Sequence, residues 1–161
     1  TVAAVGDAIA TPADPLRIRA DAAAMRGRLL RDLPASGPWD VKLRPGGGIE
    51  VEFIAQVLQL IHGVRPGQQA TRVALQALAD DGQLLPATAA MLIHADRLWR
   101  TVQSMARITV GRGTPTLPDT AAEALVRVVT PGLDLARLRA TLDATAVQVR
   151  GAFTTLVGNP E

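Results

Sequence analysis

Apolar residues recur along this 161-residue chain at helical spacing, and strict alternation with polar residues is rare. The dipeptide Asp14-Pro15 has the form of an N-cap followed by proline at the first helical position, so a helix is predicted from about Pro15 to Leu33. The apolar stripe that should face the core consists of Ile18, Ala22, Met25, Leu29 and Leu33.

The arginines around this stripe are expected to form a solvated face, with the alternative that one or two of them reach a phosphate or an acidic neighbouring domain. They are Arg17, Arg19, Arg26, Arg28 and Arg31.

Five further helices are predicted downstream. The second helix of the chain should be buried on most sides, because Ile54 and Leu58 widen the stripe formed by Ile49, Phe53, Val57, Leu60 and Ile61. The others cover about Gln69–Ala79, Pro86 to about Val110 and a segment opened by a capping box at Thr120–Glu123; a last helix carries Leu135, Leu138, Leu142, Val149, Phe153 and Leu156. The fold class is therefore all-α, most simply a bundle of about six helices with short connections. Residues 1–14 are interpreted as a leader or the end of a preceding domain, and residues 15–161 as one helical domain.

Composition excludes several classes of site. The chain has no cysteine, which rules out disulfides, thiolate zinc sites and thiol nucleophiles and fits a cytoplasmic location. His62 and His94 lie far apart, so no metal site is expected from them. With a net charge of only +2 and dispersed arginines, nucleic-acid binding is not expected. No apolar run approaches the roughly 20 residues of a membrane span.

One stretch, "WDVKLRPGGGIEVEF", stands out for its chemistry. Lys42 is the only lysine of the chain, and it precedes Arg44 and the run Gly46-Gly47-Gly48. Glycines at a helix N-terminus can offer backbone N–H groups to an anion, helped by the helix dipole and by nearby cations. The alternative is a tight turn that needs a positive φ. The run is not a Walker loop, since no Lys-Ser or Lys-Thr follows it.

Two glutamates follow the glycines. On a helix, Glu50 and Glu52 point roughly 200° apart and cannot chelate one ion together. Glu50 is expected in the first helical turn, where a carboxylate suits the dipole. Glu52 lies among apolar residues and needs a partner, either an arginine or a bound cation. Trp39 and Trp99 are expected to pack in the core or at its edge.

This stretch resembles the segment aromatic-D-(I/V/L)-K-x-x-x-G-G-x-x-D/E-(I/V)-E-F of bacterial glutamine synthetase adenylyltransferases, and "IRADAAAMRGRLL" resembles the family helix that precedes it. A related version occurs in PII uridylyltransferases. The resemblance implies a bifunctional enzyme that transfers AMP from ATP, with Mg²⁺, to a tyrosine of glutamine synthetase and removes it, under the control of PII and glutamine. "PGGGIEVEF" is nearer to the adenylylating, C-terminal half, so the chain looks like the helical domain that follows that half's nucleotidyltransferase domain.

The resemblance also implies what the fragment lacks. The catalytic domain of the superfamily carries G-S…D-x-D, and this chain contains neither Gly-Ser nor Asp-x-Asp. No catalytic residue, metal site or cofactor is therefore expected in the fragment by itself, and ATP and Mg²⁺ belong to the full-length enzyme. The alternatives are a regulatory module that binds PII, glutamine or glutamine synthetase, and the equivalent domain of a PII uridylyltransferase.

By the same resemblance, the motif should lie where the helical domain meets the catalytic domain. Lys42 would approach the nucleotide phosphates or a catalytic carboxylate, with Arg44 adding charge. Gly46 and Gly47 would let the backbone come close, and Glu52 would pair with an arginine to fix the loop. The family usually has aspartate at the position of Glu50.

Overall fold

The computed structural model describes residues 14–63, 70–110, 119–129, 131–132 and 134–160, and within them it contains helices and no strands. The helices are α2 (Pro15–Asp32), α3 (Gly48–Ile61), α4 (Thr71–Asp80), α5 (Pro86–Val110), α6 (Asp119–Val129) and α7 (Leu135–Leu156). The predicted all-α class is confirmed, and the predicted boundaries agree closely with these bounds. The predicted leader, apart from residue 14, lies outside the described residues.

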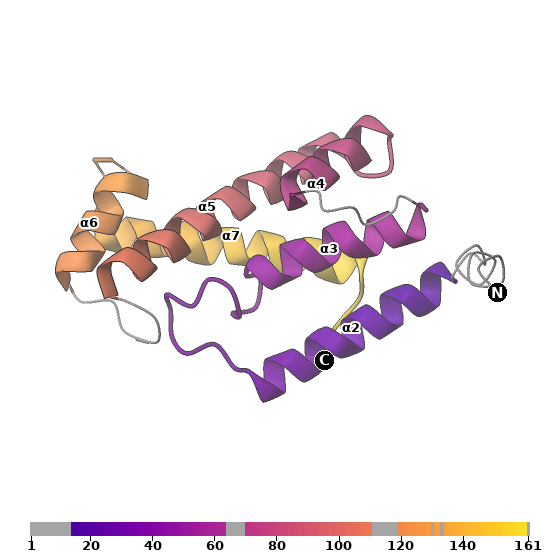
Figure 1. Ribbon diagram of the computed structural model, residues 1–161, viewed down its shortest axis with the longest axis horizontal. Helices are drawn as coiled ribbons and strands as arrows, with labels where there is room; N and C mark the ends of the chain where they lie inside the picture. The colour runs from indigo at the N-terminus through magenta and orange to yellow at the C-terminus, as the bar shows by residue number, and fades with distance from the viewer. Residues whose placement is uncertain (1–13, 64–69, 111–118, 130, 133, 161) are drawn as a thin grey trace, which may run out of the picture.

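Helix α3 lies at the centre of the arrangement. It packs against α2, α4, α5 and α7, while α4 folds back along α5 and α6 contacts the ends of α5 and α7 (Figure 1). Because α3 has neighbours on several sides, seven of its fourteen residues are buried. Helix α2 lies at the edge of the molecule, and α3 is its main helical neighbour among the helices described.

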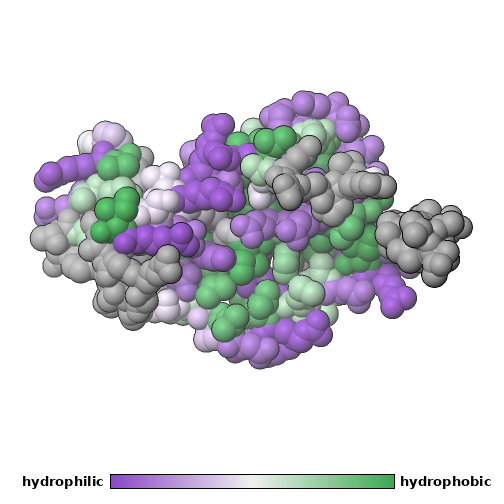
Figure 2. Space-filling model, in the orientation of Figure 1, coloured by the Kyte–Doolittle hydropathy of each residue, from purple (hydrophilic) through white to green (hydrophobic). Residues whose placement is uncertain are grey.

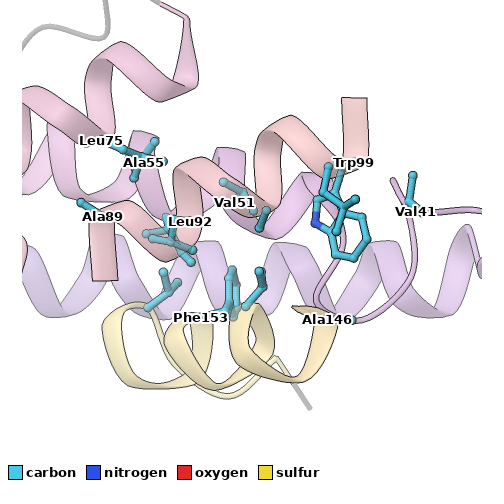
Figure 3. Packing of buried hydrophobic residues seen from close by; sticks show 14 of the residues in the cluster. Val41, Val51, Ala55, Leu75, Ala89, Leu92, Trp99, Ala146 and Phe153 are labelled. Carbon is cyan, nitrogen blue, oxygen red and sulfur yellow. The ribbon is translucent and has the colours of Figure 1, made fainter. Parts of the chain in front are cut away.

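The core joins α3, α4, α5 and α7. Val51, Leu75, Leu92 and Phe153, one from each of these helices, are fully buried within it (Figure 3). The two tryptophans behave as predicted: Trp99 is buried at the end of the core nearest Val41, and the partly buried Trp39 packs against its edge. Within the described part of the chain, no helix is long and apolar enough to cross a membrane.

The predicted orientation of α2 is only partly right: Ile18 and Ala22 of the predicted stripe pack against the core, but the stripe is not the most buried side of the helix. Its buried residues are Ala23, Arg26 and Gly27, whereas Met25 of the predicted stripe is 48% exposed and Leu33, just past the helix end, is 53% exposed. At 100° per residue the three buried residues are centred roughly 110° from the middle of the predicted stripe. This orientation carries Arg26 into the protein, so it does not belong to the solvated face that the sequence suggested.

The C-terminal residues help to hold α2 in this orientation. They cross the helix at Gly27, where an added Cβ would overlap the carbonyl oxygen of Pro160. Only glycine allows so close an approach of two backbones. The first described helix and the last described residues are therefore packed together.

Candidate functional site: a loop held by a buried glutamate

The candidate motif lies in the connection from α2 to α3. Asp40 organises the first part of this loop by accepting hydrogen bonds from the backbone N–H of Ser36 (3.1 Å) and of Leu43 (3.1 Å). Arg139 of α7 places its guanidinium 5.9 Å from the ring centre of Trp39, within the range of a cation–π contact. The loop is thus a built structure and runs along α7.

The N–H groups of the glycine run donate within the chain. Gly46 donates to Oε2 of Glu50 (3.0 Å). The next two glycines, Gly47 and Gly48, donate to the carbonyl oxygens of Arg44 (2.9 Å) and Val41 (2.9 Å). Since these donors are satisfied in this arrangement, an anion at this place would have to be bound by side chains.

Two of the glycines are required for steric reasons. Gly46 has a φ of +74°, so the predicted positive-φ turn is confirmed at this residue. A Cβ added to Gly46 would overlap the carbonyl oxygen of Ala146, which means that the loop backbone lies directly on α7. A Cβ on Gly47 would lie 2.6 Å from the carbonyl oxygen of Val41 and 2.8 Å from that of Lys42. The glycines therefore let the loop backbone come close to other backbone atoms of this chain.

Glu50 holds the loop from inside. It lies in the first turn of α3, as predicted, and its side chain is completely buried. The carboxylate accepts hydrogen bonds from Nε of Arg26 (2.9 Å), Nη1 of Arg150 (2.8 Å) and the N–H of Gly46 (3.0 Å). These contacts join α2, the loop, α3 and α7 at one point.

Arg26 completes the connection. Its Nη2 donates to the carbonyl oxygens of Leu43 (2.8 Å) and Arg44 (3.1 Å) while its Nε binds Glu50. Two guanidinium groups face one carboxylate here, and the side chain of Arg150 is 23% exposed, so water can solvate the remaining positive charge. We refer to Arg26, Glu50 and Arg150 as the buried ion cluster.

Glu52 pairs with an arginine, as predicted, but with one that lies on α5 and not in the loop. Its closest arginine is Arg100 of α5, at 3.9 Å, and both side chains are about half exposed (41% and 52%). Arg100 lies nearer to Asp96, one helical turn earlier on α5, at 3.0 Å. The contact of Glu52 ties α3 to α5, so the glutamate that fixes the loop is Glu50.

The two cations of the motif, Lys42 and Arg44, differ in whether they are already paired within the chain. Arg44 binds Oδ1 of Asp143 on α7 at 2.6 Å. Lys42 is exposed, and its ammonium group makes no hydrogen bond or ion pair with any part of the chain that the structure describes. Lys42 is therefore the motif cation that can meet another molecule. Among the described residues, no three acidic, histidine or cysteine side chains gather as a metal ion would need.

Sequence reasoning missed Arg26 and Arg150 as partners of the motif. One signal was available for Arg26, which follows the small residues Ala22, Ala23 and Ala24 and precedes Gly27, a setting that lets a helix approach its neighbour closely. Nothing in the local sequence indicates Arg150, because it lies 100 residues from Glu50.

A family model described as GlnD PII-uridylyltransferase matches residues 19–157. The chain belongs to this family. Its curated relatives include the "bifunctional glutamine synthetase adenylyltransferase/adenylyl-removing enzyme" of Bradyrhizobium sp., 34% identical over 93% of this chain and 16% of the relative. The enzyme of that name from Brucella suis also matches, at 33% identity over 96% of this chain and 16% of the relative. The one from Caulobacter vibrioides is 36% identical over 65% of this chain and 10% of the relative.

The resemblance to glutamine synthetase adenylyltransferases is therefore confirmed. The chain spans about a sixth of the length of the Bradyrhizobium relative, 16% of it. No solved structure matches the chain.

Proposed function

We propose that this chain is the non-catalytic helical portion of a glutamine synthetase adenylyltransferase and that it follows the nucleotidyltransferase domain of the adenylylating half. In this proposal the whole enzyme uses ATP and Mg²⁺ to transfer AMP to a tyrosine of glutamine synthetase, removes it again, and responds to PII. The observation that carries the proposal is the shared name of the curated relatives, whose similarity extends over as much as 96% of the chain. The absence of Gly-Ser and Asp-x-Asp from the sequence supports a role outside the chemical step.

Within this proposal the loop presents Lys42 to the catalytic domain. The buried ion cluster and the contacts of Gly46 hold the loop backbone against α7. Arg44 is engaged by Asp143, which leaves Lys42 as the exposed cation of the motif. A lysine ammonium group suits a phosphate oxygen or a carboxylate as a compact charge on a long stem. Lys42 is thus proposed to contact the nucleotide phosphates or a catalytic carboxylate.

Replacing Lys42 in the full-length enzyme tests this role. Lys42→Ala is expected to lower AMP transfer to glutamine synthetase by roughly tenfold or more, equivalent to about 1.4 kcal/mol of transition-state stabilisation. The melting temperature should stay unchanged, because the side chain is exposed. Arg97→Ala, which removes an exposed cation from α5, is the matched control. Full transfer activity in Lys42→Ala would overturn the proposed role.

The family model itself favours a second candidate, the equivalent domain of a PII uridylyltransferase, because its description names that enzyme. Incubating the full-length protein with labelled ATP or UTP, and with glutamine synthetase or PII as acceptor, separates the two. Label from ATP on glutamine synthetase supports the proposal, and label from UTP on PII supports the alternative. A purely regulatory module would instead give Lys42 variants with normal basal transfer and an altered response to PII or glutamine.

A further inference from the structure

Helix α2 carries apolar side chains that the fold leaves partly uncovered. Met25 is 48% exposed and Leu33 is 53% exposed, while Ile18, Ala22 and Leu29 of the same stripe are only partly buried. Leu60, on the neighbouring helix α3, is 51% exposed. Figure 2 shows hydrophobic surface over the region where α2 and α3 lie. Ile18 and Ala22 pack against the core, so the uncovered part of the stripe, which we call the outer stripe of α2, consists of Met25, Leu29 and Leu33.

The outer stripe is more than a scatter of exposed apolar residues. Single exposed apolar residues are normal on a protein surface, but these three recur at intervals of four residues, the spacing of one helix face. The side of α2 that meets the rest of the protein is centred on Ala23, Arg26 and Gly27. The helix therefore has one side bound to the domain and an adjacent side available to a partner.

Helix α2 cannot bury the outer stripe by rolling against α3. A roll would pull Arg26 away from Glu50 and from the two loop carbonyls, leaving a buried carboxylate with only Arg150 and Gly46 as partners. It would also disturb the contact between Gly27 and Pro160. Since breaking a buried ion pair is strongly unfavourable, the stripe has to be covered from outside.

We propose that the outer stripe packs against another domain of the same, longer polypeptide, which under the proposed function is the nucleotidyltransferase domain. The length of the relatives leaves room for such a domain, because the chain corresponds to only 16% of the Bradyrhizobium protein. The charges beside the stripe have both signs: Arg17 lies 3.8 Å from Asp21 in an exposed ion pair, and Arg28, Arg31 and Asp32 are also exposed on α2. The stripe also ends at Leu33, where the loop that carries Lys42 begins.

Hydroxyl-radical footprinting, read by mass spectrometry, tests the coverage without any substitution. The oxidation rates of Met25 and Leu33 are compared between the isolated chain and the full-length protein. Burial of Met25 from 48% exposed to the level of an interface core should slow its oxidation about fivefold. Leu85 and Val147, both 73% exposed and outside the stripe, are the internal controls and should keep their rates. An unchanged rate at Met25 would overturn the inference.

Photo-cross-linking identifies the partner. Benzoylphenylalanine in place of Met25, in the full-length protein, should give an internal cross-link to another domain of the same polypeptide, and the same residue in place of Val147 should not. A cross-link between two copies, or to glutamine synthetase, would overturn the proposal. An internal cross-link in a protein that does not transfer AMP would support this inference and overturn the proposed function. AMP transfer by a protein in which Met25 is not protected would support the proposed function and overturn this inference.

Discussion

Glu50→Gln is the substitution that most directly tests how the loop is held. Glutamine keeps the shape of the side chain and can accept a hydrogen bond through one oxygen, but it removes the negative charge that faces Arg26 and Arg150. Arg26 has a fully buried side chain, so its guanidinium would remain in the interior without an opposite charge of matching geometry. The amide nitrogen of glutamine would also lie close to N–H donors and could accept from none of them.

The expected loss can be worked out from the contacts. Hydrogen bonds to charged groups contribute about 1.5–3 kcal/mol each, and Glu50 accepts three, from Arg26, Arg150 and Gly46. Their sum is an upper bound, because the amide retains one acceptor and the partly exposed Arg150 can turn to water. The direct expectation for a broken buried pair is roughly 3–5 kcal/mol. This is a large share of a total stability of about 5–15 kcal/mol, and it lowers the melting temperature by roughly 6–20 °C.

Urea denaturation and differential scanning calorimetry measure this loss on the purified chain. Glu52→Gln is the matched control, since it makes the same substitution two residues away on the same helix. Its partner Arg100 lies at 3.9 Å and both side chains are well exposed, so the expected cost is about 0–1 kcal/mol. Equal losses in the two variants would refute the reasoning that the buried ion cluster, and not the glutamates in general, stabilises the loop.

Three further outcomes follow from the packing. A positive φ alone costs a non-glycine residue roughly 1 kcal/mol. Gly46→Ala should destabilise the chain by more than this in urea denaturation, because the added Cβ also overlaps Ala146. Gly63→Ala, at a similar φ but with open space around the Cβ, should cost only about 1 kcal/mol. Asp96→Asn should cost about 1–3 kcal/mol by thermal melting, since it weakens contacts to Arg72 and Arg100. Leu92→Ala should cost about 2–5 kcal/mol in the same assay, and a loss below 1 kcal/mol would contradict its place in the core.

The boundaries of the helices were predictable because their signals are local. Asp14-Pro15 and Pro86 mark helix starts that the structure reproduces, and the apolar residues predicted for the last helix, from Leu135 to Leu156, all lie within α7. Each of these signals depends on residues within a turn or two of one another. The orientation of α2 was not predictable in this way, since it depends on Arg26 meeting Glu50, 24 residues away.

In the candidate site, too, local features were predictable and tertiary contacts were not. The sequence brought Lys42, Arg44, Gly46, Gly47 and Glu50 together because they are neighbours in the chain. It could not predict which glutamate faces inward, because helical periodicity places Glu50 and Glu52 on different sides without saying which side another helix covers. Glu50 is the glutamate that binds Arg150 in the interior, and only the tertiary fold brings Arg150 to α3.

The buried ion cluster also bears on the order in which the chain acquires its structure during synthesis. Arg150 is synthesised 124 residues after Arg26, and the Pro160 segment that crosses α2 follows later still. At about 5–20 residues per second, roughly 6–25 s separate the synthesis of Arg26 from that of Arg150. Until then Glu50 has only part of its set of partners. Helix α2 is therefore translated well before the residues that fix its final position.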